Sequence, residues 1–348
     1  MATGHGVDRD VLAAYCFICR HYRPSDRIFL FGFSRGAYTV RIVAAMIYLI
    51  GLLREDQVNF AGYALKAYKS AAATGDLEIA YRFQRIVNSA PRPIHFMGVW
   101  DTVSSIIAPG PNPLTTPRLE ELPFASQNPA VRTFRHAMAI DEFRRMFRLE
   151  NWVEPQEFKP NPHSTPKQPR SQDIKQVWFA GCHSDVGGGF VEEQSALSKY
   201  SLLWMLEQAK AEGLFLRTAM INHLVRGHER KNARPYTKPD AAGPLLISLT
   251  RGWKLLEYLP RKISYREWPK RRGLLGRYLP RGEPLPIPEG CLIHTSAVER
   301  RRRVEGYDPV NWPAVHVLET ITGVVPESGP RRTARRSHHT AITRPGSA

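Results

Sequence analysis

One segment near the start of the chain, RIFLFGFSRGAYTVRIVAAMIYLIG, constrains the fold more than any other. The apolar run Ile28 to Phe31 is typical of a buried parallel strand, and a helical pattern of apolar residues runs from Ser34 to Gly51. Between them stands a Gly-x-Ser-x-Gly pattern, with Gly32 and Gly36 two positions on either side of the serine. A strand, a sharp turn and a helix around such a serine predict a nucleophile elbow.

Serine is a weak nucleophile at its free pKa, so catalysis by Ser34 would need a base, an acid that orients this base, and donors for the developing oxyanion. We expect the missing side chains of Gly32 and Gly36 to let a strained turn pass close to the neighbouring strand and helix. The turn also puts the backbone N–H of Arg35 at a helix N-terminus, where it can serve as an oxyanion donor. Ser34 is therefore the predicted nucleophile.

Two aspartates follow predicted strands and compete for the role of the acid. Asp101 follows the strand Ile94 to Trp100, and Asp185 follows the strand Gln176 to Gly181. In hydrolases with such an elbow the acid usually comes after the second strand beyond the nucleophile, which favours Asp185. Asp101 and His183 are then expected as supporting neighbours. No further ligands follow His183 and Asp185 at a metal-site spacing, so we expect no metal there.

The base should come late in the chain, because the hydrolase order is Ser, acid, His. Spacing alone does not choose among the late histidines, which are His223, His228, His294, His316, His338 and His339. His294 follows the apolar run CLI and a proline-rich loop, like a residue that leaves a last strand. His223 and His228 lie in a predicted helix instead.

Buried strands alternate with helical patterns along most of the chain. This alternation predicts an α/β fold with a mostly parallel sheet, helices on both faces and long loop excursions. Further helices are expected at about residues 8–22, 60–73, 77–88 and 197–212, and proline-rich loops at about 107–129 and 155–169. We expect one catalytic domain over residues 1–325 and a basic, disordered tail over residues 326–348.

The charge balance is strongly basic: 49 Lys and Arg stand against 32 Asp and Glu, a formal charge of +17. Anionic lipid headgroups are the favoured partner after a merely solvated basic face, and nucleic acid is not expected because no binding motif supports it. The stretch from about Arg230 to Pro288 is compatible with an interfacial cap, although an irregular outer layer is slightly favoured. Its basic, Trp-bearing part from Trp253 to Arg281 motivates a membrane hypothesis. We expect peripheral contact with an anionic membrane surface as one use of this charge.

Neither a spanning apolar run nor an ordinary secretion signal is found in the sequence, so we expect a protein made in the cytoplasm. The four cysteines are too few and too scattered for a disulfide framework, and the CxxC pair is expected on a buried helix face rather than at a metal. They are Cys16, Cys19, Cys182 and Cys291. We expect no cofactor.

Several segments together resemble the DUF2235 family, the catalytic domain of Tle1-type phospholipase effectors of type VI secretion systems. They are GFSRGAYTVR, GVWDTV, RHAMAIDEFRRMF, WFAGCHSDVGGGF, LLWMLEQAKAEGL, and IHTSAVERR followed by YDPVNWP. The resemblance covers roughly residues 4–313. It implies an α/β-hydrolase core, a lipid or other ester as substrate, and a secretion-system or immunity partner. It also implies export without a signal peptide, or membrane association.

The resemblance implies that Ser34 is the nucleophile, Asp185 the acid and His294 the base, and it is what selects His294. Members of the family open with a strand ending in an Asp-Gly-Thr-like segment, and more strands precede the elbow. Since this chain reaches its nucleophile at residue 34, either its start is misassigned or it is a truncated remnant. We expect a fold truncated at the N-terminus with an exposed sheet edge. The leading hypothesis is a serine ester hydrolase of phospholipase A type that forms an acyl-enzyme. The alternative is a non-catalytic homologue that binds anionic lipid or another acidic partner.

Overall fold

A computed structural model of the chain describes residues 4–103, 107–108, 118–119, 124–145, 147–164, 168–246, 248–249, 251–321 and 324–325. Its main sheet has seven strands in the order β1-β2-β5-β8-β12-β13-β14. The first six run parallel, and β14 pairs antiparallel with β13. The strands are β1 (Ile28–Phe33), β2 (Ile94–Trp100), β5 (Val131–Ala139), β8 (Asp173–Phe179), β12 (Cys291–His294), β13 (His316–Glu319) and β14 (Val324–Val325). The predicted α/β fold with a mostly parallel sheet is confirmed.

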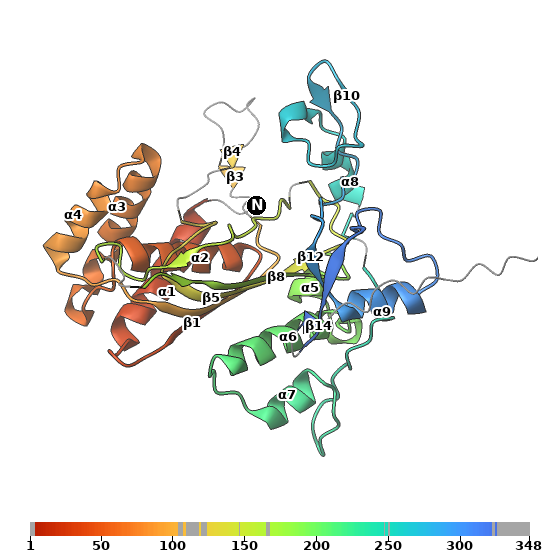
Figure 1. Cartoon of the computed structure of the whole chain (residues 1–348), viewed down its shortest axis with the longest axis horizontal. Helices are drawn as coiled ribbons and strands as arrows, with labels where there is room; N and C mark the ends of the chain where they lie inside the picture. Colours follow the sequence, from red (N-terminus) through yellow and green to blue (C-terminus); the bar gives the residue numbers. More distant parts are fainter. Residues whose placement is uncertain are drawn as a thin grey trace, which may run out of the picture.

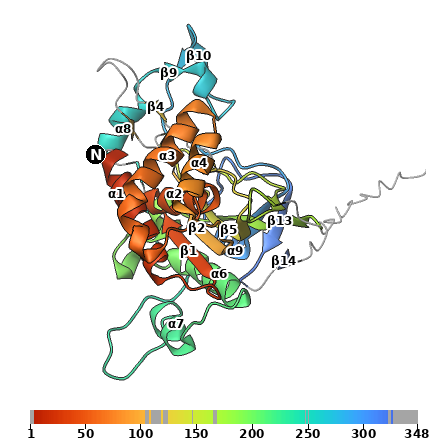
Figure 2. The same cartoon turned by 90° about the vertical axis from the view of Figure 1, so that its left-hand side faces the viewer.

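Helices cover both faces of this sheet, as Figures 1 and 2 show. One face carries α1 (Gly4–His21), α2 (Arg35–Leu49), α3 (Ala61–Thr74) and α4 (Glu78–Val87), and the other carries α6 (Ser198–Ala211). The helix α7 (Thr218–Leu224) packs on the outside of α6, and α9 (Thr295–Arg303) packs on β8 and β12. The predicted helices at residues 8–22, 60–73, 77–88 and 197–212 are therefore present with small shifts of their ends.

The elbow helix α2 lies in the centre of the larger hydrophobic cluster. Its residues from Ala37 to Leu49 are buried with the single exception of Val40, which is partly buried. A helix that is apolar on nearly all sides has to be covered on all sides. The sheet covers one side of α2, while α1 and α3 cover others. Burial of this helix fixes the position of Ser34, the residue that precedes it.

The central strand β5 has no counterpart among the strands that the sequence predicted. Its residues are almost all buried, yet they include Arg135 and His136, which interrupt the apolar run. Arg135 is buried because its guanidinium pairs with Asp173 at 2.6 Å and with Gln208 at 2.7 Å. A search for apolar runs therefore misses this buried strand, because two polar side chains interrupt the run.

The strand β1 stands at one edge of the main sheet and pairs only with β2 among the described strands. Phe31 on this strand is 37% exposed. Among the described strands β1 is therefore an edge strand, and the expected N-terminal truncation stays a prediction. The division into a domain over residues 1–325 and a tail stays a prediction, since residues 326–348 lie outside the described part.

Smaller elements complete the described part of the chain. They are η1 (Glu55–Phe60), β3 (Ile107–Ala108), β4 (Arg118–Leu119), β6 (Glu157–Phe158), β7 (Arg170–Ser171), α5 (His183–Gly187), η2 (Glu192–Gln194), α8 (Arg251–Glu257), β9 (Arg261–Lys262), η3 (Ile263–Tyr265), β10 (Gly273–Leu274) and β11 (Arg277–Tyr278). All four cysteines are free thiols. Within the described ranges, none of the helices combines the length and apolar character needed to cross a bilayer.

Candidate active site

The turn between β1 and α2 holds Ser34 in a strained backbone conformation, with φ 56° and ψ −120°. Positive φ is uncommon for residues other than glycine and is found where the surrounding structure enforces it. Here the turn brings Gly32 against the start of α2, so that a Cβ on Gly32 would lie 2.4 Å from the carbonyl oxygen of Gly36. A Cβ on Gly36 itself would meet no atom within 4 Å. Close approach therefore requires glycine at position 32 and not at position 36.

The side chain of Ser34 faces His183. The Oγ of Ser34 lies 2.8 Å from Nε2 of His183, and the Nδ1 of the same ring lies 2.5 Å from Oδ2 of Asp101. His183 and Asp101 are both almost fully buried, whereas Ser34 is half-buried. A hydroxyl, an imidazole and a carboxylate joined in this order form the hydrogen-bond chain of a serine-hydrolase triad.

Adjacent ends of parallel strands bring these three residues together. Ser34 and Asp101 follow β1 and β2, which are neighbours in the sheet, and His183 opens α5 after β8. Asp101 has φ 37°, and its Oδ1 accepts a hydrogen bond from the backbone N–H of Ala139 at 3.1 Å. The second carboxylate oxygen is thereby aimed at His183.

Two aromatic rings enclose the imidazole of His183. The ring of Phe33 lies 4.6 Å from it and the ring of Phe147 lies 4.9 Å from it, between centroids. Phe33 can take this position only because residue 187 is glycine: a Cβ there would lie 2.0 Å from the phenyl ring. The glycine run after the histidine thus makes room for an aromatic wall, as close packing requires.

A buried carboxylate holds the backbone of His183. Glu142 accepts a hydrogen bond from the N–H of His183 at 3.2 Å and forms a bidentate pair with Arg144, at 2.8 Å to each oxygen. Burial raises the pKa of Glu142, but the bonds from Arg144 and the nearby His183 lower it more, so that the pKa lies below its ordinary value. Glu142 is therefore ionised at neutral pH and ties the segment after β5 to the histidine.

Asp185, the acid that the sequence favoured, faces away from this chain of hydrogen bonds. Its Oδ2 accepts from the N–H of Cys182 at 3.1 Å and from the N–H of Leu246 at 3.3 Å. The residue lies inside α5, in the first turn, and closes a capping box with Cys182. Burial raises its pKa. Asp185 has a structural place at the start of α5 instead of a bond to a histidine, because the segment that carries it is a helix whose first turn it caps.

His294, the expected base, does end a strand, but its partners are also structural. Its Nδ1 lies 2.8 Å from the Oγ of Ser296, and its ring stacks on Phe179 at 4.6 Å. Burial lowers its pKa to about 3, so the ring is neutral. The Ser34–His294–Asp185 chain that we expected is thus not formed among the described residues, because Ser34 bonds to His183 and His294 caps α9 inside the core.

The remaining late histidines lie elsewhere. His223 bonds to the carbonyl oxygen of His228 at 3.0 Å, and His316 belongs to β13. His338 and His339 lie outside the described residues. The order Ser34, Asp101, His183 satisfies the hydrolase chain order as well as the expected set did. The sequence also contained a signal for the observed arrangement, because Asp101 and His183 each follow a buried strand.

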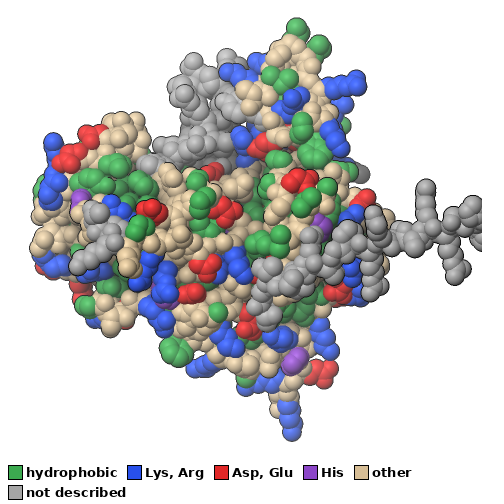
Figure 3. Space-filling model, in the orientation of Figure 1, with side chains coloured by type: hydrophobic (Ala, Val, Ile, Leu, Met, Phe, Trp, Pro, Cys, Tyr) green, Lys and Arg blue, Asp and Glu red, His purple; other side chains and the backbone are tan. Residues whose placement is uncertain are grey.

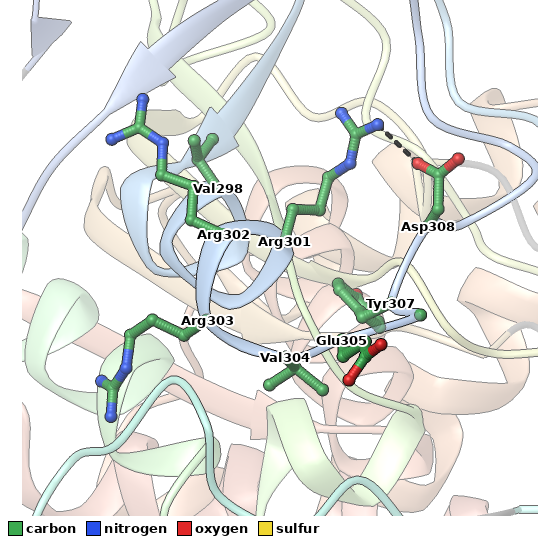
Figure 4. A pocket seen from close by; sticks show the side chains of 9 residues that line it. Val298, Arg301, Arg302, Arg303, Val304, Glu305, Tyr307 and Asp308 are labelled. Atoms are coloured by element: carbon green, nitrogen blue, oxygen red, sulfur yellow. Dashed lines mark hydrogen bonds and ion pairs between the residues drawn. The ribbon is translucent and has the colours of Figure 1, made fainter.

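A separate hollow of about 720 Å³ lies at the end of α9 (Figure 4). Its lining is basic and open, and Figure 4 shows the guanidinium of Arg301 turned to the carboxylate of Asp308, at 2.5 Å. None of the residues of the Ser34–His183–Asp101 chain lines it. In the described part of the chain no cluster of three His, Cys, Asp or Glu has the arrangement of a metal site.

The mostly parallel sheet and the strained elbow after β1 define a fold of the α/β-hydrolase type. Residues 1–208, more than half of the 348, match the family described as "T6SS, Phospholipase effector Tle1-like, catalytic domain". The chain belongs to this family, which bears out the resemblance seen in its motifs. The family is one of lipase-like phospholipase effectors of type VI secretion.

Three similar proteins each align with only part of the chain. The uncharacterized protein YEL023C of Saccharomyces cerevisiae is 30% identical over 150 residues, which are 41% of this chain and 21% of that protein. An uncharacterized protein from Pseudomonas aeruginosa is 20% identical with a TM-score of 0.30, covering 55% of this chain and 24% of the other. The Tle1 effector bound to the VgrG spike is also 20% identical, with a TM-score of 0.25, covering 56% and 31%. This chain thus spans a third or less of each relative.

Proposed function

We propose that this chain is a serine ester hydrolase of the phospholipase type, in which Ser34 is the nucleophile, His183 the general base and Asp101 the residue that orients the base. The observation that carries the proposal is the continuous hydrogen-bond chain through these three side chains. Family membership supports a lipid ester as the substrate class. Asp185 and His294, which have structural partners, are no longer part of the proposed triad.

The proposed reaction proceeds in two halves. Ser34 Oγ attacks the ester carbonyl carbon while its proton passes to Nε2 of His183, and the carbonyl oxygen becomes an oxyanion. The tetrahedral intermediate collapses, the C–O bond to the alcohol breaks, and the alcohol leaves with the proton from His183. Water then attacks the acyl-enzyme carbonyl carbon while giving a proton to His183. The bond between the acyl carbon and Ser34 Oγ breaks, His183 returns the proton to this oxygen, and the carboxylic acid is released.

Two features support stabilisation of the charges that this reaction creates. Arg35 is the first residue of α2, so its backbone N–H is among the amides that have no acceptor within the helix and can receive an oxyanion. Asp101 lies against the Nδ1 of His183, where its negative charge would stabilise the imidazolium formed when Ser34 loses its proton.

Hydrolysis of a panel of phospholipids and simple carboxylic esters tests this proposal. We expect the wild-type chain to release fatty acid and Ser34→Ala to release none above the uncatalysed rate. Ser296→Ala is a matched serine control, since Ser296 lies in a core position against His294. If no ester in the panel is turned over, or if Ser34→Ala is as active as the wild type, the proposal is overturned.

A second candidate function is favoured by the formal charge of +17, which suits binding of an acidic partner without chemistry. In that case the chain would associate with anionic vesicles in a salt-dependent manner, and no ester would be hydrolysed. Membership in a family of type VI secretion effectors also suggests a component of that apparatus as a partner and export by that route. Co-purification of the chain with a VgrG spike protein, the component bound in the Tle1 structure, tests this part.

A further inference from the structure

Residues 251–283 form a small unit that projects from the main body, which we call the hairpin module. It contains α8 and a three-stranded sheet in the order β10-β11-β9. Figures 1 and 2 place this module at one end of the molecule and α7 at the opposite end. The module is held at its base by buried ion pairs and exposed at its tip.

The tip of the module is apolar. Leu274 and Leu275, at the turn between β10 and β11, are 79% and 93% exposed. Leu275 has φ 50°, in the left-handed region that a two-residue turn of this kind normally fills with Gly, Asn or Asp. A large apolar side chain thus occupies an exposed position where neither folding nor backbone geometry favours it. Such residues mark interaction sites.

The helix α8 and the segment after it add further exposed apolar surface. Leu255 is 73% exposed, Tyr258 57% and Leu259 54%. Figure 3 shows hydrophobic side chains at the outer end of this region, with Lys and Arg side chains around them. Since full burial of one such side chain is worth about 1.5–3 kcal/mol, contact with an apolar phase would be strongly favourable.

Acidic and basic side chains lie in different parts of the module. It holds ten Lys and Arg and three Glu. The glutamates lie at the base: Glu283 pairs with the buried Arg145 at 3.2 Å, Glu267 pairs with Arg148 at 2.5 Å, and Glu257 accepts from the N–H of Arg145 at 2.7 Å. Cations are left on the outer surface, where Lys254, Lys262, Arg266, Lys270, Arg272, Arg277 and Arg281 are exposed.

We propose that the hairpin module docks on an anionic lipid bilayer, with Leu274 and Leu275 inserted among the acyl chains and the surrounding cations at the headgroup phosphates. Apolar side chains inside a ring of cations match the layered chemistry of such a surface, where each cation contributes about 1 kcal/mol. A nucleic acid would leave the leucines unused. An irregular outer layer, which the sequence slightly favoured for this stretch, would not gather leucines at its tip.

Side-chain contacts connect the module to the candidate active site. Trp253 of α8 lies 5.4 Å from the ring of Phe147, and the guanidinium of Arg144 lies over both rings. Phe147 in turn packs against His183. Docking of the module would therefore hold Ser34 and His183 near a lipid surface, an inference that rests on the proposed lipid-ester function.

Vesicle flotation of the full chain tests the proposal, with Ser34→Ala as the background so that lipids stay intact. We compare phosphatidylcholine vesicles with and without phosphatidylserine. We expect flotation with the anionic vesicles, and at least about tenfold weaker binding for the double variant Leu274→Thr, Leu275→Asn. Asn tolerates the positive φ at position 275 and Thr suits a strand, so the module should stay folded.

Phe215→Ser is the matched control, because Phe215 is 96% exposed and lies in the connection between α6 and α7. It should bind like the background protein. Tryptophan fluorescence of Leu274→Trp, quenched by lipids brominated in their acyl chains, reports insertion directly. Flotation of the double variant equal to that of Phe215→Ser, absence of flotation with anionic vesicles, or absence of quenching would each overturn the proposal. Ser34→Ala should lose ester hydrolysis but keep flotation with anionic vesicles. The membrane-docking proposal is thereby tested independently of the proposed function.

Discussion

Nε2 of His183 lies 2.8 Å from the Oγ of Ser34, although 149 residues separate the two in the chain. The contact arises because the carboxyl ends of the parallel strands β1 and β8 lie on the same side of the sheet, with the elbow after β1 and α5 after β8. Asp101 follows the carboxyl end of β2 on this side and completes the chain of hydrogen bonds.

Asp101→Asn should lower kcat for ester hydrolysis by about 10³–10⁴-fold with little effect on folding. Asparagine tolerates the positive φ of residue 101, and its amide oxygen can still accept from Ala139. Its NH2 group would face Nδ1 of His183 and favour the tautomer in which Nε2 carries the proton and cannot accept one from Ser34. Steady-state kinetics together with a thermal unfolding curve check this, and a fully active variant would contradict it.

Gly32→Ala should destabilise the chain by about 1–3 kcal/mol or more, because the new Cβ would lie 2.4 Å from the carbonyl oxygen of Gly36. Gly36→Ala is the matched control. Its Cβ has open space in the first turn of α2, where alanine is up to about 1 kcal/mol more favourable than glycine. Urea unfolding curves compare the two variants, and equal losses of stability would show that the elbow is not packed in this way.

Acid should destabilise the folded chain partly through His294. Burial lowers its pKa to about 3, whereas the unfolded chain takes up this proton near pH 6.5. Between these values the unfolded state binds more protons, so the free energy of unfolding falls as the pH is lowered. His294→Asn removes the titration and keeps a side-chain acceptor at the N-cap of α9.

We expect the pH dependence of stability in this variant to be shallower by up to about 1.4 kcal/mol per pH unit between about pH 6 and pH 4. Urea unfolding at several pH values measures the difference. Because His136, whose pKa burial also lowers, is present in both proteins, its contribution cancels. Parallel stability curves for the two proteins would mean that His294 takes up its proton in the folded state.

Arg41 links the elbow helix to the segment that carries Asp101. Its guanidinium is fully buried, donates to Thr102 Oγ1 at 2.9 Å and to the carbonyl oxygens of Ala125 and Glu150. Arg41→Met would leave these buried acceptors without their donor, at a cost of about 3 kcal/mol. Thr102→Val removes a single bond and should cost about 1 kcal/mol. Chemical denaturation ranks the two variants, and the reverse ranking would refute this role of Arg41.

Much of the fold follows from local sequence patterns. The apolar runs before Ser34 and Asp101 became β1 and β2, and the helix after the elbow is as buried as its composition requires. The strand β5 escaped prediction because Arg135 and His136 lie inside it, and the burial of Arg135 depends on its distant partners Asp173 and Gln208. No local pattern contains those partners.

The candidate site was predictable in part. Ser34 and the segments that carry Asp101 and His183 could be located, since each directly follows a buried strand. The pairing could not be chosen, because Asp185 and His183 are two residues apart and which of them faces Ser34 depends on the turn of α5. The rule that the base comes late in the chain restricted the candidates to the late histidines, among which the family resemblance selected His294. The chain order is also satisfied when His183 follows Asp101.

The rate of covalent labelling by a fluorophosphonate tests the central claim most directly, when measured for wild type, Ser34→Ala, His183→Ala and His294→Asn. We predict that Ser34→Ala is not labelled, that His183→Ala is labelled about 10³-fold more slowly or worse, and that His294→Asn keeps most of the wild-type rate. Labelling that survives in folded His183→Ala and is lost in folded His294→Asn would contradict the proposed chain of Ser34, His183 and Asp101.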